Sequence, residues 1–148
     1  KVENSWKAID IYNAAQNIKN FSTGVFPSHW LEMVKSRLYD GDEIAAWTLH
    51  RIVRDILTTL SPICPFFTHY LSTTLYDGSS VDVREFPAII PSELELLELT
   101  IPLIEFNSNV WKLKKDSGIS LNTEIPDISI PDDLEYLSNS LNRMHRII

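Results

Sequence analysis

The segment between Asp42 and Pro62 constrains the fold most, because its apolar residues recur with the period of a helix. Six of them fall on one side of that helix: Ala45, Leu49, Ile52, Val53, Ile56 and Leu60. Asp42 and Glu43 favour a helix start through the helix dipole, and Ser61-Pro62 favours its end. We therefore expect a buried helix of a helical bundle between these two signals.

Most of the remaining chain shows the same helical period, interrupted by turn signals and alternating stretches. Helices are predicted over residues 5–21, 29–39, 65–76, 92–116 and from 131 onward, with a break at Ser22-Thr23-Gly24. Residues 81–87 should be extended, and residues 119–130 alternate like short strands.

The 148 residues have room for one domain with a small appendage. The predicted fold class is mainly α, a helical bundle followed by a small C-terminal α+β segment. We predict that residues 1–90 form the bundle. Residues 91–148 would form a long helix plus the small C-terminal segment, packed on the bundle.

The chain carries a formal charge of −7, which by itself disfavours a nucleic-acid binder. The charges are unevenly spread, because 12 of the 13 Lys and Arg residues lie in residues 1–60 and 112–148. A fold that brings the two ends together would present a basic face on an acidic molecule. The alternative is a mixed, solvated surface.

Motifs that carry catalytic chemistry are missing from the sequence. It has no glycine-rich phosphate loop, no His-Glu-x-x-His pair and no Gly-x-Ser-x-Gly elbow. Its four histidines are spread out and suggest no metal site. Cys64 stands among apolar residues and is expected to be a buried, inert thiol. We predict no catalytic residue and no metal site in this chain.

The outer side of the helix between Asp42 and Ser61 is the first candidate binding surface. On a helical wheel, Trp47, Arg51 and Arg54 gather within about 60° of one another, opposite the apolar side. An indole beside two guanidinium groups suits stacking on a base while gripping phosphates. The alternative is that this side packs on another helix or domain, with the arginines in ion pairs.

Two other helices carry cations that point away from the predicted core. Lys35 shares the outer face of the 29–39 helix with Glu32 and Tyr39. The 92–116 helix ends in Trp111-Lys112-Leu113-Lys114-Lys115, which forms a compact cationic and aromatic end. The helix dipole alone also explains cations at a helix C-terminus, so both interpretations remain open.

Several stretches resemble, in the same order, the anticodon-binding region of valyl-tRNA synthetases. Residues 30–39 (WLEMVKSRLY) resemble the family's aromatic-Ile/Leu-Glu-x-x-Lys-x-Arg-Leu-Tyr stretch, and residues 45–49 (AAWTL) resemble the start of its next helix. Residues 60–68 (LSPICPFFT) are similar to its Leu-x-Pro-x-x-Pro-Phe-x-Thr joint. Residues 80–87 and 111–121 are similar to the downstream Ser-Ile/Val…Trp-Pro exit and the basic helix that ends in Gly-Ile/Met-Ser-Leu-Asn.

The chain departs from this family at four positions. His69, Tyr70 and Ser72 stand where the family usually has acidic residues and an aromatic, and Phe86 stands where Trp is usual. The same domain of an isoleucyl-, leucyl- or methionyl-tRNA synthetase therefore remains an alternative, because these enzymes share the bundle. A non-catalytic helical protein-interaction module is the other alternative.

The resemblance implies a class I synthetase bundle from a cytoplasmic enzyme that charges tRNA with valine, using ATP and magnesium. The family's His-Ile-Gly-His and Lys-Met-Ser-Lys-Ser motifs do not occur here, so the chain should need no cofactor of its own. It begins with Lys1 rather than Met, as expected for a piece of a longer polypeptide. The implied partners are the anticodon arm of tRNA and the catalytic domain of the same polypeptide, with no DNA.

No apolar run approaches the roughly 20 residues that cross a bilayer, so no membrane partner is expected either. The resemblance and the outward-facing cations together predict seven RNA-binding residues: Lys35, Trp47, Arg51, Arg54, Trp111, Lys112 and Lys115.

Overall fold

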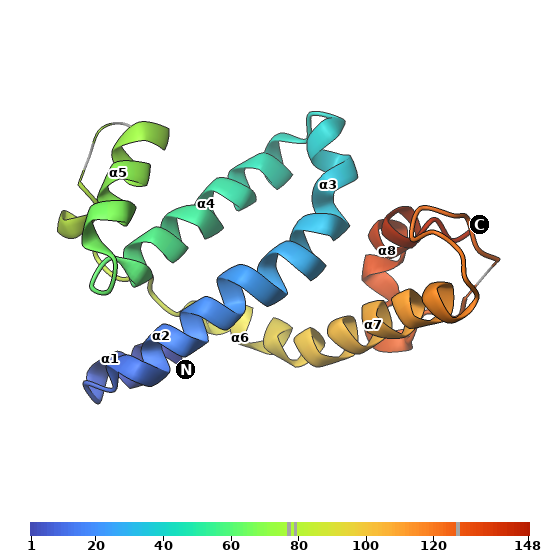
Figure 1. Cartoon of the computed structure of the whole chain (residues 1–148), viewed down its shortest axis with the longest axis horizontal. Coiled ribbons are helices and arrows are strands. Elements are labelled where there is room, and N and C mark those ends of the chain that lie inside the picture. Colours follow the sequence, from blue (N-terminus) through green and yellow to red (C-terminus); the bar gives the residue numbers. More distant parts are fainter. Residues whose placement is uncertain (77, 79, 127) are drawn as a thin grey trace. The chain divides into compact units, whose positions relative to one another are not determined.

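The computed structural model in Figure 1 describes residues 1–76, 78, 80–126 and 128–148, without the side chain of Ser92. Asp77, part of the predicted stop of the 65–76 helix, lies outside the described residues. The described residues are mainly helical, as predicted. They form two compact units, each built from two stretches of sequence. The first unit is Lys1–Gly24 with Asp42–Ala88, and the second is Val25–Gly41 with Ile89–Ile148.

The first unit is a set of packed helices around α4. Its elements are α1 (Val2–Lys7), α2 (Ile11–Asn20), α4 (Glu43–Leu60), α5 (Pro65–Leu75) and the short 3₁₀ turn η2 (Val81–Val83). The Asp42 carboxylate caps α4 by accepting the backbone N–H groups of Ile44 and Ala45, both at 3.0 Å. Such a cap contributes about 1 kcal/mol to helix stability. The predicted α4 start is therefore confirmed.

The second unit has its own hydrophobic core. Its elements are the C-terminal part of the π-helix η1 (Phe21–Leu31), α3 (Glu32–Tyr39), α6 (Pro91–Leu94), η3 (Glu95–Leu99), α7 (Thr100–Asp116), η4 (Asp132–Leu137) and α8 (Ser138–His145). Seven buried side chains form the core: Met33, Val34, Phe106, Val110, Ile125, Leu134 and Leu141.

Pro102 lies in the first turn of α7, where its missing N–H has no helical partner to lose.

The predicted helix break at Ser22-Thr23-Gly24 is wrong. Helical structure continues from α2 through a π-helix, η1 (Phe21–Leu31), into α3. The hydroxyl of Ser22 donates to the carbonyl of Ile18 at 2.7 Å, and that of Thr23 donates to the carbonyl of Lys19 at 2.8 Å. Both side chains thus bond back into the preceding helical turn instead of starting a loop.

The segment predicted to form short strands pairs at one point only within the described residues. Ile125 forms an isolated parallel bridge with Ile147. The carbonyl groups of Leu121 and Thr123 accept hydrogen bonds from the Lys114 ammonium group, both at 2.7 Å. These two carbonyl oxygens therefore accept hydrogen bonds from a side chain instead of from a neighbouring strand.

Helix α5 has an unusual orientation for an amphipathic helix. Thr68 and Ser72 are fully buried, whereas Phe66, Phe67 and Tyr70 are exposed. Cys64, at the N-cap of α5, is also exposed, so the expectation of a buried thiol is wrong. The apolar neighbours of Cys64 misled that prediction, because the helix presents much of its apolar side to solvent.

Candidate functional site

Helix α4 carries three of the seven predicted residues along one outer face. Trp47, Arg51 and Arg54 lie at successive helical spacings of four and three residues, which places them side by side. The Trp47 side chain is 63% exposed, so this indole is not packed into the chain. The Arg51 guanidinium lies 5.8 Å from the centre of the Trp47 ring, within cation–π range.

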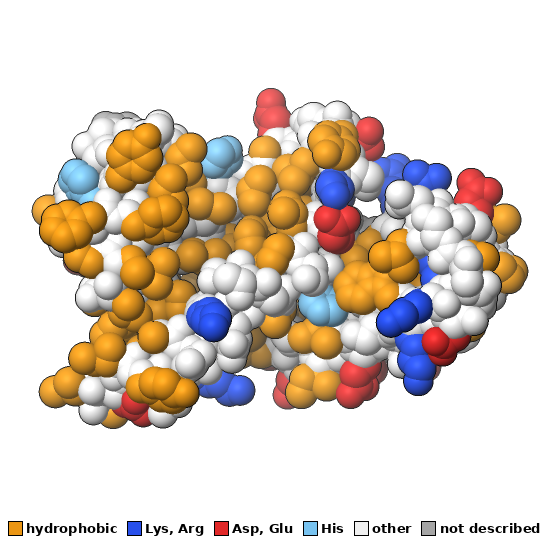
Figure 2. All heavy atoms as spheres, viewed as in Figure 1, with side chains coloured by type: hydrophobic (Ala, Val, Ile, Leu, Met, Phe, Trp, Pro, Cys, Tyr) orange, Lys and Arg blue, Asp and Glu red, His pale blue; other side chains and the backbone are white. Residues whose placement is uncertain are grey.

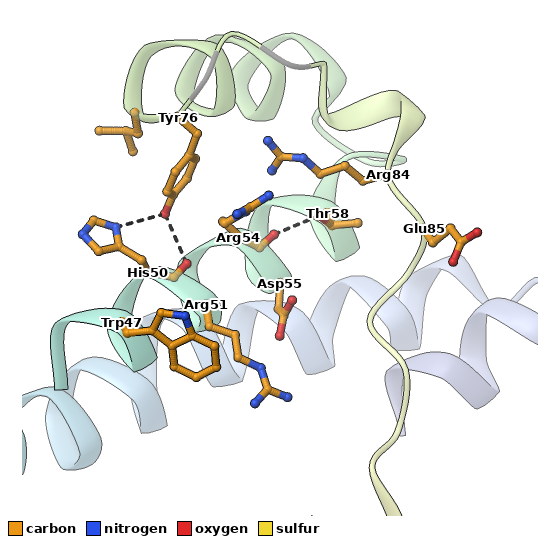
Figure 3. Close-up of a pocket in the computed structure, with 10 residues that line it drawn as sticks. Trp47, His50, Arg51, Arg54, Asp55, Thr58, Tyr76, Arg84 and Glu85 are labelled. Atoms are coloured by element: carbon orange, nitrogen blue, oxygen red, sulfur yellow. Dashed lines mark hydrogen bonds between the residues drawn. The ribbon is translucent and has the colours of Figure 1, made fainter. Parts of the chain in front are cut away.

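These three residues line one cavity of about 660 Å³, which we call the α4 cavity, and α5 and the segment after η2 complete its wall. Tyr76 follows α5 and points toward α4, with its hydroxyl over His50 (Figure 3). That hydroxyl donates to the His50 carbonyl at 3.2 Å. The two rings meet edge to face, with centroids 5.9 Å apart.

Tyr76 also gathers two guanidinium groups at the cavity. Arg54 lies 5.3 Å and Arg84 lies 5.9 Å from the centre of its ring. Burial raises the pKa of the Tyr76 phenol, and the charges of the two arginines only partly oppose this. Tyr76 is therefore a neutral phenol near pH 7, able to donate a hydrogen bond.

The cavity concentrates positive charge on an acidic molecule. Its lining includes three arginines, Arg51, Arg54 and Arg84, against two carboxylates, Asp55 and Glu85. Aromatic surface lies between the cations, from Trp47 and Tyr76. Cations interleaved with rings suit a single-stranded nucleic acid, because phosphates and unstacked bases are both available to them.

The sequence analysis missed His50, Tyr76 and Arg84 as members of this site. His50 and Tyr76 are 26 residues apart and meet only because α4 and α5 fold back on each other. Helical periodicity describes one helix at a time, so it carries no signal for such a contact. The one available hint was that Arg84 is the single cation in residues 61–111.

The second unit holds the predicted residues of the α7 end. Trp111, Lys112 and Lys115 line a separate cavity of about 810 Å³, and both lysines are exposed. The Trp111 indole, in contrast, is half-buried and packs against two imidazole rings. Its ring centre lies 5.3 Å from that of His29 and 5.8 Å from that of His145.

Lys114, in the middle of the same basic run, is fully buried and serves the fold. Its ammonium group donates to the carbonyls of Leu121, Thr123 and His145, each at 2.7 Å. Burial, and then the positive charge of Arg146, lower the pKa of Lys114. This cation ties the C-terminal segments to α7 and is unavailable to an external anion.

A buried polar chain runs beside Lys114. The Nε2–H of His145 donates to Oδ1 of Asn107 at 2.7 Å, and Nδ2 of Asn107 donates to Nδ1 of His29 at 3.1 Å. Burial, and then the charge of Lys114, lower the pKa of His145 to about 4. Burial also lowers the pKa of His29. Both histidines are therefore neutral near pH 7.

Lys35, the seventh predicted residue, lies on α3 in the second unit. Its ammonium group forms an ion pair with Glu32 at 2.7 Å. The hydrogen bond and charge of Glu32 raise the pKa of Lys35. An anion that binds Lys35 would have to compete with this carboxylate.

Among the described residues, no group of three His, Cys, Asp or Glu side chains is placed to hold a metal ion. In the same part of the chain, none of the helices combines the length and apolar character that crossing a membrane requires.

Comparison with known proteins identifies a family for nearly the whole chain. The anticodon-binding domain of tRNA ligases matches residues 1–130. The chain is 31% identical to the valine–tRNA ligase of Aeropyrum pernix over 97% of its own length, which is 19% of that relative. It is 32% identical to the Nanoarchaeum equitans valine–tRNA ligase over 90% of the chain and 17% of the relative.

The chain thus spans about a fifth of the length of the curated relatives that it matches. No solved structure matches it significantly. The family match covers α1 to α7, including both cavities that carry the predicted residues. This chain belongs to the family of anticodon-binding domains of tRNA ligases.

Proposed function

We propose that the chain is the anticodon-binding part of a valine–tRNA ligase that works in the cytoplasm. It holds the anticodon arm of tRNA(Val) so that the acceptor end reaches a catalytic domain on the same polypeptide. The observation that carries the proposal is the α4 cavity, in which the rings of Trp47 and Tyr76 lie within cation–π range of three arginines. The relatives named valine–tRNA ligase support the choice of amino acid.

Each side chain of the α4 cavity has a role in this proposal. Trp47 stacks on an unpaired loop base, because its indole is largely exposed. Arg51 and Arg54 bind flanking phosphates, which supply most of the affinity in a salt-dependent way. Arg84 adds a third cation from the segment after η2.

Lys112 and Lys115 provide a second, weaker phosphate contact at the end of α7, with Trp111 beside them. Lys35 contributes only when an RNA phosphate displaces Glu32. The ATP and magnesium of the aminoacylation reaction would bind to the catalytic domain. This assignment agrees with the absence of a phosphate loop from the sequence.

The test separates tRNA binding from amino-acid activation. In the ligase, Arg54→Ala should weaken tRNA(Val) binding and leave valine-dependent ATP–pyrophosphate exchange unchanged, because the activation step does not involve the anticodon arm. Lys19→Ala, on the exposed surface of α2, is a control that also removes one positive charge and should change neither assay. Equal losses in both assays for Arg54→Ala would reject the proposal.

Salt dependence tests the proposal against a helical protein-interaction module. Binding of tRNA through phosphates must weaken as the salt concentration rises. A chain that binds no tRNA even at low salt would be an interaction module instead.

A further inference from the structure

Helix α5 presents an aromatic face to solvent. Phe66, Phe67 and Tyr70 are 91%, 58% and 65% exposed, and we call these three residues the α5 aromatic face. At about 100° per residue they lie within an arc of about 100°, opposite the buried Thr68 and Ser72. An ordinary surface helix has the reverse arrangement, with rings inside and hydroxyls outside.

The buried Thr68 hydroxyl on the inward side of α5 nevertheless has a hydrogen-bond partner. The hydroxyl of Thr68 donates to the Cys64 carbonyl at 2.9 Å, so its burial leaves no unpaired polar group. In Figure 2, hydrophobic side chains gather over α5. Adjacent exposed rings of this kind mark an interaction surface.

The chemistry of α5 favours a protein partner over RNA. The helix contains no Lys, Arg, Asp or Glu residue over its 11 positions. It therefore offers no cation for phosphates, which dominate the affinity of nucleic-acid surfaces. Aromatic residues without charges are typical of the core of a protein–protein interface. The partner surface should accordingly be apolar.

The relatives indicate where such a surface comes from. About four fifths of each relative lies outside the region that matches this chain. We propose that the α5 aromatic face docks against an apolar protein surface on the remainder of the ligase polypeptide. This inference rests on the proposed function, because it requires the chain to be part of such a ligase.

Docking through α5 has a consequence for tRNA charging. Leu75 at the end of α5 and Tyr76 directly after it line the α4 cavity. The same helix therefore joins the docking surface to the RNA site. Fixing α5 on the remaining polypeptide fixes the direction in which the bound anticodon arm leaves the cavity, and so the position of the acceptor end.

Hydroxyl-radical footprinting of the full ligase, read by mass spectrometry, tests the docking directly. The internal control is Tyr136 on η4, which is 64% exposed and lies among Asp132, Asp133 and Glu135. If α5 is docked, Tyr70 should be oxidised at least about 5-fold more slowly than Tyr136, because covered rings react slowly.

Three results would overturn the proposal. Tyr70 oxidised as fast as Tyr136 would mean that the α5 aromatic face stays open. Protection that appears only with tRNA would assign the face to RNA. Protection that disappears on dilution would assign it to a second copy of the protein.

A pair of substitutions tests the functional consequence. In the ligase, Tyr70→Ser should lower kcat/KM for aminoacylation about 10-fold through misplacement of the acceptor end. Affinity for an isolated anticodon hairpin and ATP–pyrophosphate exchange should stay unchanged. Equal aminoacylation by Tyr70→Ser and Tyr136→Ser would contradict docking. The RNA site and the docking can fail separately. If Tyr70 is protected but the Trp47→Ala ligase keeps full tRNA affinity, docking of the α5 aromatic face is supported and the RNA site is rejected.

Discussion

The α4 face and the end of α7 carry similar sequence patterns, and the structure uses them differently. Both place a tryptophan and a cation four residues apart, Trp47 with Arg51 and Trp111 with Lys115. On α4 the indole is largely exposed and the cation lies over it. At α7 the indole is half-buried and packs against two imidazole rings. It therefore has less surface left for a ligand than the Trp47 indole.

The comparison also shows how burial divides a run of like charges. Lys112 and Lys115 are exposed, whereas Lys114 between them is fully buried and holds three carbonyl groups. In this run, α7 turns Lys114 inward and leaves the other two lysines in water. Sequence composition alone treats the three as equivalent, although one stabilises the fold and two are available to a ligand.

The largest effect should come from the buried member of this run. Lys114→Met removes three hydrogen bonds from a charged donor and leaves buried carbonyls unpaired, which should cost about 3 kcal/mol or more. Urea unfolding followed by circular dichroism measures the loss. The exposed neighbour provides the control, since Lys115→Met should change the free energy of unfolding by less than about 0.5 kcal/mol. Equal effects would remove the distinction between the two lysines.

Replacing each tryptophan separates the two regions by function. Trp47→Ala should weaken binding of an anticodon hairpin by about 1–3 kcal/mol, the usual value for one stacked base. Trp111→Ala should instead mainly lower the free energy of unfolding, because that ring packs against His29 and His145. Hairpin titrations and urea unfolding of both variants provide the measurements. The reverse pattern would show that α7 carries the stacking site.

The buried histidine makes the second unit sensitive to acid. The pKa of His145 in the folded chain, about 4, lies below its ordinary value of 6.5. On acidification the imidazole therefore gains its proton in the unfolded state first. The contribution of neutral His145 to folding stability is fully present above pH 6.5 and falls as the pH drops toward 4. We expect a loss of about 2 kcal/mol between pH 7 and pH 4.5.

Urea unfolding at the two pH values checks this expectation, with one variant for comparison. His145→Gln should flatten the pH dependence, because it removes the buried imidazole. A wild-type chain equally stable at both pH values would contradict a neutral, buried His145.

The smallest effect concerns the hydroxyl of Tyr76, a residue that lines the α4 cavity. Tyr76→Phe keeps the ring between its guanidinium neighbours and removes the hydrogen bond to the His50 carbonyl. The expected loss is about 1 kcal/mol of folding stability, the net value of one such bond. Thermal unfolding of the variant tests this, with Tyr12→Phe on the exposed surface of α2 as the control. A Tyr76→Phe variant as stable as that control would mean that the bond contributes nothing.

Local signals in the sequence were sufficient to predict α4 and its outer face. Asp42 lies at the start of the helix as expected, and helical spacing alone places Trp47 next to Arg51. Both predictions concern residues within one or two turns of each other, where helix geometry fixes the neighbours. The family resemblance added the order of the helices and the type of ligand.

The contacts that complete the site lay beyond such reasoning. Tyr76 reaches His50 only through the packing of α5 on α4, and the inward turn of Lys114 depends on carbonyls 7, 9 and 31 residues away. The break expected at Ser22 failed for a related reason. A serine hydroxyl serves a turn or a helix equally well, and the surrounding chain decides between them. The predicted domain boundary at residue 90 stays a prediction, which limited proteolysis would test.

The four tryptophans allow the most direct test of the RNA site. Each indole N–H gives its own signal in a proton–nitrogen NMR spectrum, and Trp6, Trp30, Trp47 and Trp111 report on different parts of the chain. During titration with the tRNA(Val) anticodon hairpin at low salt, the Trp47 signal should move most, while those of Trp6 and Trp30 stay in place. A saturated complex in which the Trp47 signal has not moved would contradict the account.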